Sequence, residues 1–321
     1  LALCSENIKT SHNTITDGSQ HMQCVAYGGT GSSQNIQTNF QPALLMIKHR
    51  NSNTTNQFWF DRLRGVSNAT YGTVRPTTTG AATSSANYMT DFLSTADGDS
   101  INGFTVNSNE TNMNNGLNVA WCWRADDSFT PTGSSISNAS GLRNTDAGFS
   151  IVKWDGASGG GNITHGLNQA PEFVIYKNVA ATNNWDIYHD HISGPQKSAG
   201  DLCDGLIFTS ATPRSNSVRK PRVSNIDLVD GYTNGANKVM VAYCWHSVSG
   251  YSSFGAYSAT GNSTGHPDTD EAFVNTGFKP AFVVVKSISA ANDWSIRDNV
   301  RDTQNPRTKA LRWNVQGSPG D

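Results

Sequence analysis

The sequence predicts an all-β protein built of tandem antiparallel β-sandwich repeats of the jelly-roll or lectin-like type. Only 15% of the 321 residues are charged, and Asn, Ser, Thr and Gly supply most of the polar character. These residues favour turns and strand surfaces over helix faces. Short β-branched and aromatic runs lie between Gly, Asn and Ser clusters, a pattern typical of short strands joined by turns. One phrase, a proline followed by an apolar run and a lysine, occurs three times.

The repeated phrase reads "PALLMIKHR" at 42–50, "PEFVIYKNV" at 171–179 and "PAFVVVKSI" at 280–288. An Asn-rich turn and an aromatic strand follow each copy. Proline is tolerated as the first residue of a strand, and charge is common where a strand meets its turn. We therefore expect the prolines to open strands and the lysines to be solvated at strand ends; these residues are Pro42, Pro171, Pro280, Lys48, Lys177 and Lys286. Repetition of such a phrase favours a modular building block over a single active site.

A closing strand ends the first two repeats, as "LNVAWCWRADD" at 117–127 and "KVMVAYCWHSV" at 238–248. Alternation places Trp121 and Trp123 on one face and Cys122 on the other, and Tyr243, Cys244 and Trp245 repeat this pattern. The third repeat reaches "LRWNVQGSPGD" without such a strand. Either the chain was cut there, or another segment supplies the strand by β-augmentation.

The repeats predict five segments. They are a leader or linker at 1–20, repeat 1 at 21–128, a linker at 129–145, repeat 2 at 146–249 and a partial repeat 3 at 250–321. The leader has no counterpart before the other repeats, so it is either a donor strand for repeat 3 or a plain linker. Because the chain starts at Leu1 without a signal sequence, we expect a processed product or an interior piece of a longer polypeptide.

The repeated phrase and the "VAWCW" and "VAYCW" strands together resemble a repeat domain of unknown function in tail-fibre and virion structural proteins of marine bacteriophages. That family's phrase ends in Asp-x-x-Arg-Gly after an aromatic strand. The matching residues are Phe40, Pro42, Lys48, Asp61, Arg64 and Gly65 in repeat 1, and Phe278, Pro280, Lys286, Asp298 and Arg301 in repeat 3. Repeat 2 departs from the pattern, with "HDHISG" instead. The leader is similar to the junction that follows an upstream lectin-like domain. The resemblance implies a β-sandwich protein of a phage particle, with no catalytic residues to transfer.

Net charge and hydropathy argue against nucleic acid and membrane as partners, and the cysteines indicate no disulfide framework. The 23 basic and 25 acidic residues give a net charge of −2, so no net field attracts nucleic acid or an anionic membrane. No apolar stretch approaches the length of about 18 residues of a transmembrane helix. The five cysteines form no disulfide framework or CxxC pair, although Cys4 and Cys24 could pair if the leader folds back.

Two kinds of short motif could bind metal, a histidine pair and two acidic clusters. His189 and His191 are expected on one face of a strand with Asp190 on the other, but two ligands without a third at a telling spacing favour a surface strand. The acidic clusters "DGDS" at 97–100 and "DTDE" at 268–271 could bind calcium, although Asp and Gly are also ordinary turn residues. The prediction is therefore no metal site, with calcium kept as a possible ligand.

Two other stretches stand out. "SGGGN" at 158–162 opens no helix, so we expect a hairpin tip and not a phosphate loop. "PRSNSVRKPRV" at 213–223 could face an anionic glycan, nucleic acid or a neighbouring subunit, or be a solvated loop; its cationic residues are Arg214, Arg219, Lys220 and Arg222. It has no interleaved aromatic residues, which argues against nucleic acid.

The sequence predicts a structural, non-enzymatic protein of a phage particle or extracellular fibre, assembled by strand sharing. No GxSxG elbow is present, and the cysteines lie in apolar strands, so no nucleophile is evident. Expected partners are other copies, other virion proteins or host glycans, with no nucleic acid, membrane or cofactor, in a virion or extracellular location. The alternative is a carbohydrate-binding adhesin module, since Asn, Asp and Trp are abundant in loops. A secreted hydrolase ranks below both.

Overall fold

The prediction of an all-β protein is confirmed. The computed structural model describes residues 15–52, 54–66, 72–84, 86–107, 110–193, 195–208, 210–258, 274–289 and 292–316. In this part of the chain the strands form antiparallel sheets. The helical elements described are short: η2 (Gly18–Gln20), η3 (Thr95–Asp97) and α1 (Asp190–Ser193).

Repeat 1 consists of two facing sheets. The four-stranded sheet has the order β1-β7-β3-β4, with bounds Met22–Gly28, Leu117–Trp123, Leu44–His49 and Gln57–Asp61. The three-stranded sheet has the order β2-β6-β5, with bounds Gln34–Gln37, Gly103–Val106 and Met89–Leu93. Alternate residues of both sheets, among them Leu45, Cys122 and Phe104, share one apolar core. Strand alternation therefore directs half of each sheet's side chains into this core.

Repeat 2 has a similar arrangement on a larger scale. Its eight-stranded sheet has the order β16-β15-β14-β13-β18-β11-β10-β8, with bounds Ser210–Arg219, Leu202–Ile207, Trp185–His189, Phe173–Asn178, Val239–Trp245, Phe149–Gly156, Ile136–Asn144 and Asp127–Phe129. The facing sheet is β17-β12-β9, with bounds Asn225–Leu228, Gly161–Thr164 and Gly133–Ser134. A second core containing Cys244, Val174 and Ile226 lies between the two sheets.

The segment 129–145, expected to be a linker, consists largely of strands. β9 and β10 both lie within it, and β10 pairs with β11 along most of its length. The reason is backbone pairing, because a strand beside a long apolar neighbour satisfies its own N–H and C=O groups whatever its turn-like composition. Repeat 2 therefore begins earlier in the chain than the repeated phrase indicates.

Repeat 3 contributes a single sheet to the described structure. β19 (Phe282–Val285) pairs with β20 (Ser295–Asp298), and β20 pairs with β21 (Leu311–Arg312). The same position along the phrase is occupied by β3 in repeat 1 and β13 in repeat 2. β3 has two partners, β4 and β7, and β13 likewise has β14 and β18.

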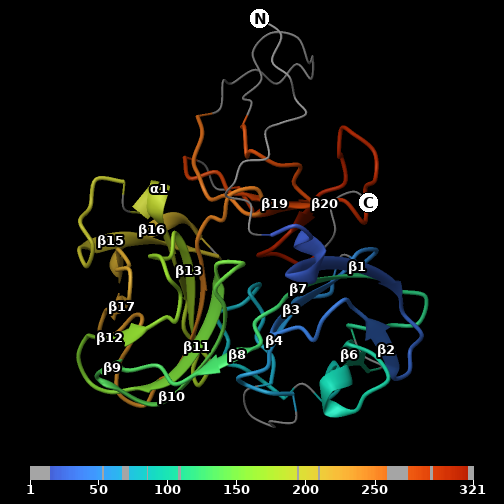
Figure 1. The fold of residues 1–321 in the computed structure, drawn as a ribbon, viewed down its shortest axis with the longest axis horizontal. Coiled ribbons are helices and arrows are strands. Elements are labelled where there is room, and N and C mark those ends of the chain that lie inside the picture. Colours follow the sequence, from blue (N-terminus) through green and yellow to red (C-terminus); the bar gives the residue numbers. More distant parts are fainter. Residues whose placement is uncertain are drawn as a thin grey trace, which may run out of the picture.

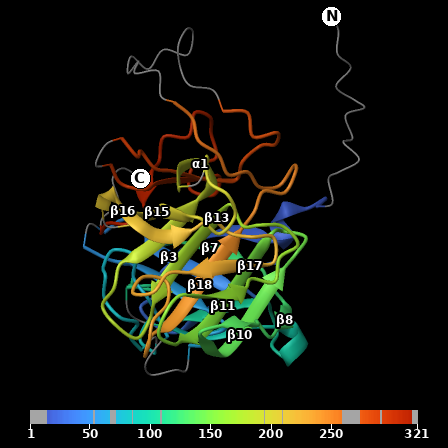
Figure 2. The ribbon, with the colours of Figure 1, turned by 90° about the vertical axis from the view of Figure 1, so that its left-hand side faces the viewer.

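The three repeats meet around one central core. Figure 1 shows repeat 1 in blue to teal on the right, repeat 2 in green to orange on the left, and β19 and β20 of repeat 3 above them. Figure 2 shows the same stacking from the side, with repeat 3 lying across the ends of both other repeats. The buried residues of this core come from all three, including Trp59 and Trp121, Trp185 and Tyr243, and Trp313.

The predicted alternation of the closing strands is confirmed. Trp121 and Trp123 of β7 point into the central core, whereas Cys122 points into the core of repeat 1. Tyr243 and Cys244 of β18 divide in the same way. Each closing strand thus has two buried faces, and this explains why it carries no charged residue.

Candidate functional site

Aromatic contacts at the centre of the molecule join all three repeats. The Trp59 ring lies 5.1 Å from Trp185 and 5.7 Å from Tyr243 of repeat 2, and 5.4 Å from Trp313 of repeat 3, measured between ring centroids. The exposed fraction of Trp59 is 0%. Such ring pairs contribute about 0.5–1.5 kcal/mol each beyond the area that they bury. The centre is therefore closely packed with aromatic side chains.

The Asp-x-x-Arg motif of repeat 1 lies at this junction. Arg64 Nε is 2.6 Å from Asp61 Oδ2, and both side chains are fully buried. Tyr243 of repeat 2 donates its hydroxyl to Asp61 Oδ2 at 2.7 Å. Burial lowers the pKa of Arg64, but the Asp61 carboxylate and the Tyr243 hydroxyl together outweigh this effect and leave that pKa raised. Burial also raises the pKa of Tyr243 well above its ordinary value, so the hydroxyl stays protonated and remains a donor.

Repeat 3 reproduces this motif against a different neighbour. Arg301 Nε lies 2.6 Å from Asp298 Oδ2, and both side chains are fully buried. Trp121 of repeat 1 donates its indole N–H to Asp298 Oδ2 at 3.2 Å. Trp121 in β7 and Tyr243 in β18 occupy the same position of the repeat, opposite Met46 and Ile175. The motif of one repeat thus contacts the closing strand of another.

Repeat 2 has His189 and Ile192 where the other repeats have aspartate and arginine. The prediction that His189 and His191 share one face of a strand is wrong, because β14 ends at His189 and the chain turns into α1. The imidazole rings are 6.1 Å apart in an edge-on arrangement. Burial lowers the pKa of His189 to about 4, so its ring is neutral at physiological pH. Within the described residues there is no group of three or more His, Cys, Asp or Glu side chains able to hold a metal ion.

The prediction that the repeated lysines are solvated is wrong for two of them. Lys48 and Lys177 are 1% and 0% exposed. The Lys48 ammonium donates a hydrogen bond to the carbonyl of Val315 at 2.9 Å, and the Lys177 ammonium donates one to the carbonyl of Thr79 at 2.9 Å. Each lysine therefore connects its own repeat to another one. Burial lowers the pKa of Lys48 to about 8, and it lowers that of Lys177 to about 7.

In the acidic cluster at 97–100, the Asp99 carboxylate accepts a hydrogen bond from its own loop. Asp99 accepts the backbone N–H of Ser94 at 2.8 Å, and the Ser94 hydroxyl accepts the N–H of Ala96 at 3.2 Å as the N-cap of η3. These are the bonds of an ordinary capped turn. The second cluster, at 268–271, lies outside the described residues.

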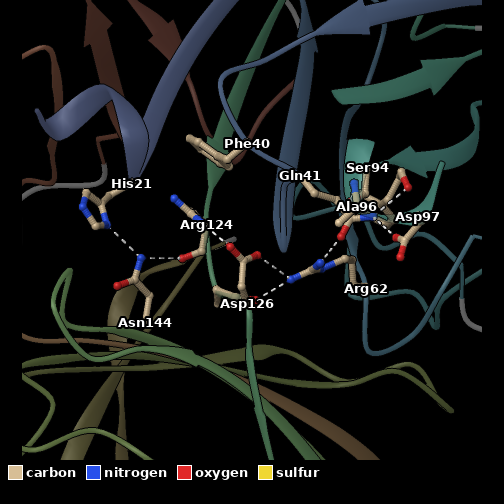
Figure 3. Close-up of polar contacts among 12 residues, drawn as sticks. His21, Phe40, Gln41, Arg62, Ser94, Ala96, Asp97, Arg124, Asp126 and Asn144 are labelled. Atoms are coloured by element: carbon tan, nitrogen blue, oxygen red, sulfur yellow. Dashed lines mark hydrogen bonds and ion pairs between the residues drawn. The ribbon is translucent and has the colours of Figure 1, made fainter. Parts of the chain in front are cut away.

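A polar chain runs from this loop to repeat 2 across the surface of repeat 1 (Figure 3). Gln41 lies between Asp97 and Arg62, and Asp126 bridges Arg62 and Arg124 at 3.1 Å and 2.5 Å. The chain ends at Asn144 of β10, which contacts both His21 Nδ1 at 2.9 Å and the carbonyl of Arg124 at 3.3 Å. The Asp126 side chain is 44% exposed, and such exposed pairs contribute about 0–1 kcal/mol. Sequence reasoning missed this junction because its residues are far apart in the chain.

The glycine-rich and basic stretches come together around one shallow cavity of about 290 Å³. Its lining includes Gly160 and Gly161 of the glycine-rich stretch, Arg219 and Arg222 of the basic stretch, and Asp227. Arg222 Nε lies 2.6 Å from Asp227, and Arg219 donates to the carbonyl of Gly200 at 2.8 Å. The remaining cations of the stretch form ion pairs, Arg214 with Asp186 and Lys220 with Asp190. Three of the four cations of the basic stretch are therefore paired with neighbouring carboxylates.

The buried cysteines and lysines are poorly placed for catalysis. Burial raises the pKa of Cys244 to about 12, and burial also raises that of Cys122, so both thiols are protonated. Lys177 has the lowered pKa of an activated amine, yet it is 0% exposed and donates hydrogen bonds to two carbonyls.

No helix in the described ranges is long and apolar enough to span a membrane. Cys4 of the possible Cys4–Cys24 pair lies outside these ranges.

These features define an all-β protein of repeated antiparallel sheets, in which the recurring polar side chains connect one repeat to the next. A family model described as a domain of unknown function (DUF7483) matches residues 17–319, and the chain belongs to this family. No curated protein and no solved structure matches the chain.

Proposed function

We propose that the protein is a non-enzymatic structural component of a phage particle or extracellular fibre, built of tandem β-sandwich modules of the jelly-roll or lectin-like type. The observation that carries the proposal is the use of the repeated polar side chains. Asp61, Asp298, Lys48 and Lys177 each contact a different repeat from their own. A motif used in this way stabilises an assembly of modules, and it recurs because the contact recurs. The sequence resemblance to virion structural proteins supports the particle location.

Repeat 3 supplies a surface suited to partners such as other copies or other virion proteins. Its exposed large apolar side chains are Tyr257 (53%), Val274 (52%), Val283 (39%), Ile288 (49%) and Val300 (37%). Exposed large apolar side chains suit contacts with a partner. In repeats 1 and 2 the described exposed residues of this type are fewer: Met113, Leu117 and Val223.

The oligomeric state of the purified chain tests this proposal. Light scattering coupled to gel filtration, with negative-stain imaging of the same sample, should show ordered oligomers or filaments. Ile288→Asp should shift the sample toward monomers, because it places a charge on the repeat 3 surface. Val223→Asp, at a residue 64% exposed in repeat 2, is the matched control and should leave the assembly intact. A monomer at all soluble concentrations would contradict the assembly role.

A carbohydrate-binding adhesin module is the second candidate, and it is favoured by the shallow cavity beside Arg222. Backbone glycine, guanidinium and carboxylate groups around one hollow suit hydrogen bonding to sugar hydroxyls. Binding to a glycan array with and without calcium tests this function. Arg222→Ala should abolish any specific signal, whereas Arg143→Ala, in an ion pair with Asp127 that does not line the cavity, should not. A signal that survives Arg222→Ala would place glycan binding elsewhere.

A further inference from the structure

One edge of β19 has no partner strand in the part of the chain that the structure describes, since its pairing there is with β20. In repeats 1 and 2 the closing strands cover the equivalent edge: β7 pairs with β3, and β18 pairs with β13. Both use the same register, with Cys122 opposite Leu45 and Cys244 opposite Val174. Val283 is the corresponding residue of β19, and it is 39% exposed. An uncovered edge leaves backbone N–H and C=O groups free to pair with an added strand.

The chain segment equivalent to the second neighbour of a closing strand is also present. In repeats 1 and 2 the closing strand lies between the phrase strand and an earlier strand, β1 or β11. In the sequence, "FGAYSATG" from Phe254 aligns with "FSIVKWDG" from Phe149 of β11. Residues 253–258 form no strand pairing among the described residues, although Phe254 stacks on Phe173 with 5.7 Å between ring centroids. By the equivalence of the repeats, a closing strand would lie between this stretch and β19.

The hydrogen bonds of the other closing strands show what an added strand would meet on its inner side. Tyr243 of β18 donates to Asp61 of repeat 1, and Trp121 of β7 donates to Asp298 of repeat 3. The motif of repeat 2 remains for the closing strand of repeat 3. His189 occupies the aspartate position of that motif, opposite the first residue of its phrase strand, as Asp61 does.

His189 has an acceptor atom that matches such a donor. Its Nδ1 atom is buried and has no hydrogen-bond partner among the described residues. Because burial lowers the pKa of His189 to about 4, the ring is neutral, and with the proton on Nε2 the Nδ1 atom accepts a hydrogen bond. A buried polar atom without a partner costs free energy that a new hydrogen bond recovers. A tyrosine or tryptophan at the place of Tyr243 would supply that bond.

The two covered edges also define the chemistry of the strand that fits. Both closing strands direct aromatic side chains into the central core and place a small alanine and a cysteine on the other face. The closing strands of a second copy cannot be donated, because β7 and β18 are each paired on both edges. The leader, whose residues 1–14 lie outside the described ranges, is not part of this site. The occupant is therefore a free extended segment with the closing-strand pattern.

We infer that repeat 3 binds an extended apolar segment of another protein chain, which adds as a strand to β19 and donates a tyrosine or tryptophan hydrogen bond to His189 Nδ1. Strand addition of this kind names the partner class for the proposed assembly role, and it rests on that role for the source of the segment. The acceptor edge itself is a property of the single chain and is tested on it.

A synthetic peptide of residues 238–248, "KVMVAYCWHSV", is the probe, because it contains the whole of β18. It should bind the purified chain, and the amides of β19 should then exchange at least about tenfold more slowly, with those of β3 unchanged. The matched control peptide carries Ala242→Pro, which removes a backbone donor, and it should bind at least about tenfold more weakly. Failure of the first peptide to bind, or equal binding of the two, would overturn the inference.

Disulfide trapping tests the register of the bound peptide. Val283→Cys in the chain places a thiol opposite Cys244 of the peptide, at the separation of directly opposed strand residues, about 4.5–5.5 Å between Cβ atoms. Under copper–phenanthroline oxidation, mass spectrometry should identify a one-to-one adduct through these two thiols. Val285→Cys is the matched control, because the same register places it opposite Ala242, and it should give much less adduct. Equal yields in the two variants would contradict this register.

A double-mutant comparison tests the hydrogen bond to His189. Tyr243→Phe in the peptide should weaken binding to the unmodified chain by about two- to tenfold. The same replacement should have no effect on binding to the His189→Ala chain, in which the acceptor is absent. An equal loss with both chains would show that His189 is not the acceptor.

The peptide and the oligomeric state separate this inference from the proposed function. A chain that binds the peptide but stays monomeric at all soluble concentrations would support the strand site and contradict the assembly role. A chain that assembles but binds no peptide would support the assembly role and overturn the strand site.

Discussion

β3 of repeat 1 and β19 of repeat 3 come from the same phrase but have different environments. Every residue of β3 is buried, with β4 and β7 on its two edges. Leu45 and Ile47 lie in the core of repeat 1, whereas Leu44 and Met46 lie in the central core. β19 is as apolar in sequence, yet its residues are partly or largely exposed. The two strands differ in their neighbours and not in their own composition. A phrase strand is therefore buried where its repeat provides a neighbouring strand on both edges, as for β3, and is more exposed where the described structure has only one, as for β19.

The largest expected effect comes from placing a charge at the same position of the phrase in β3 and in β19. Leu45→Asp buries a carboxylate in a core at 0% exposure, which we expect to cost more than about 4 kcal/mol and to unfold the chain. Val283→Asp, at the equivalent place in β19, should cost less than about 1 kcal/mol. Circular dichroism and urea unfolding of both variants measure the difference. Equal losses would show that β19 is covered as fully as β3.

The aspartate of each repeat gives the next effect. Asp61→Ala leaves Arg64 buried without its carboxylate and should cost about 3–5 kcal/mol. His189→Ala, at the equivalent place in repeat 2, should cost about 1 kcal/mol, because no arginine depends on it. Urea unfolding gives both values. If the two losses were alike, the ion pair would add little to the junction.

The buried lysines make stability depend on pH. Burial lowers the pKa of Lys177 to about 7 from 10.5, so between these values the unfolded state binds more protons. Stability should therefore rise with pH over this range, by up to a few kcal/mol, and the gain should be absent below the lower value. Lys177→Met should flatten the rise measured by urea unfolding from pH 7 to 10. Lys279→Met, at an exposed residue directly before Pro280 in repeat 3, should not alter the slope. A flat profile in the unmodified chain would exclude a neutral Lys177.

Calcium should have the smallest effect in repeat 1. Asp97 already accepts a hydrogen bond from Gln41, and Asp99 accepts one from Ser94 of its own loop. Added calcium should therefore change the melting temperature by less than about 1 °C, both in the unmodified chain and in the Asp99→Asn variant. Thermal unfolding with calcium and with chelator measures this. A rise lost in Asp99→Asn would identify 97–100 as a calcium site, whereas a rise that persists there would direct attention to 268–271.

The sequence by itself determined the fold class and the alternation of the closing strands. Strand period and turn residues are local properties, so the two faces of Trp121 and Cys122 could be read directly. The match of Asp61, Arg64, Asp298 and Arg301 to one motif was also visible.

Only the tertiary structure decided what these residues do. Lys48 and Lys177 were expected in solvent, but another repeat covers each of them, and no local pattern encodes that cover. The strands within 129–145 and the helical turn after His189 likewise depend on distant partners. Long-range packing determines which polar groups are desolvated, and desolvation determines whether a lysine or an aspartate is a surface charge or a buried connection.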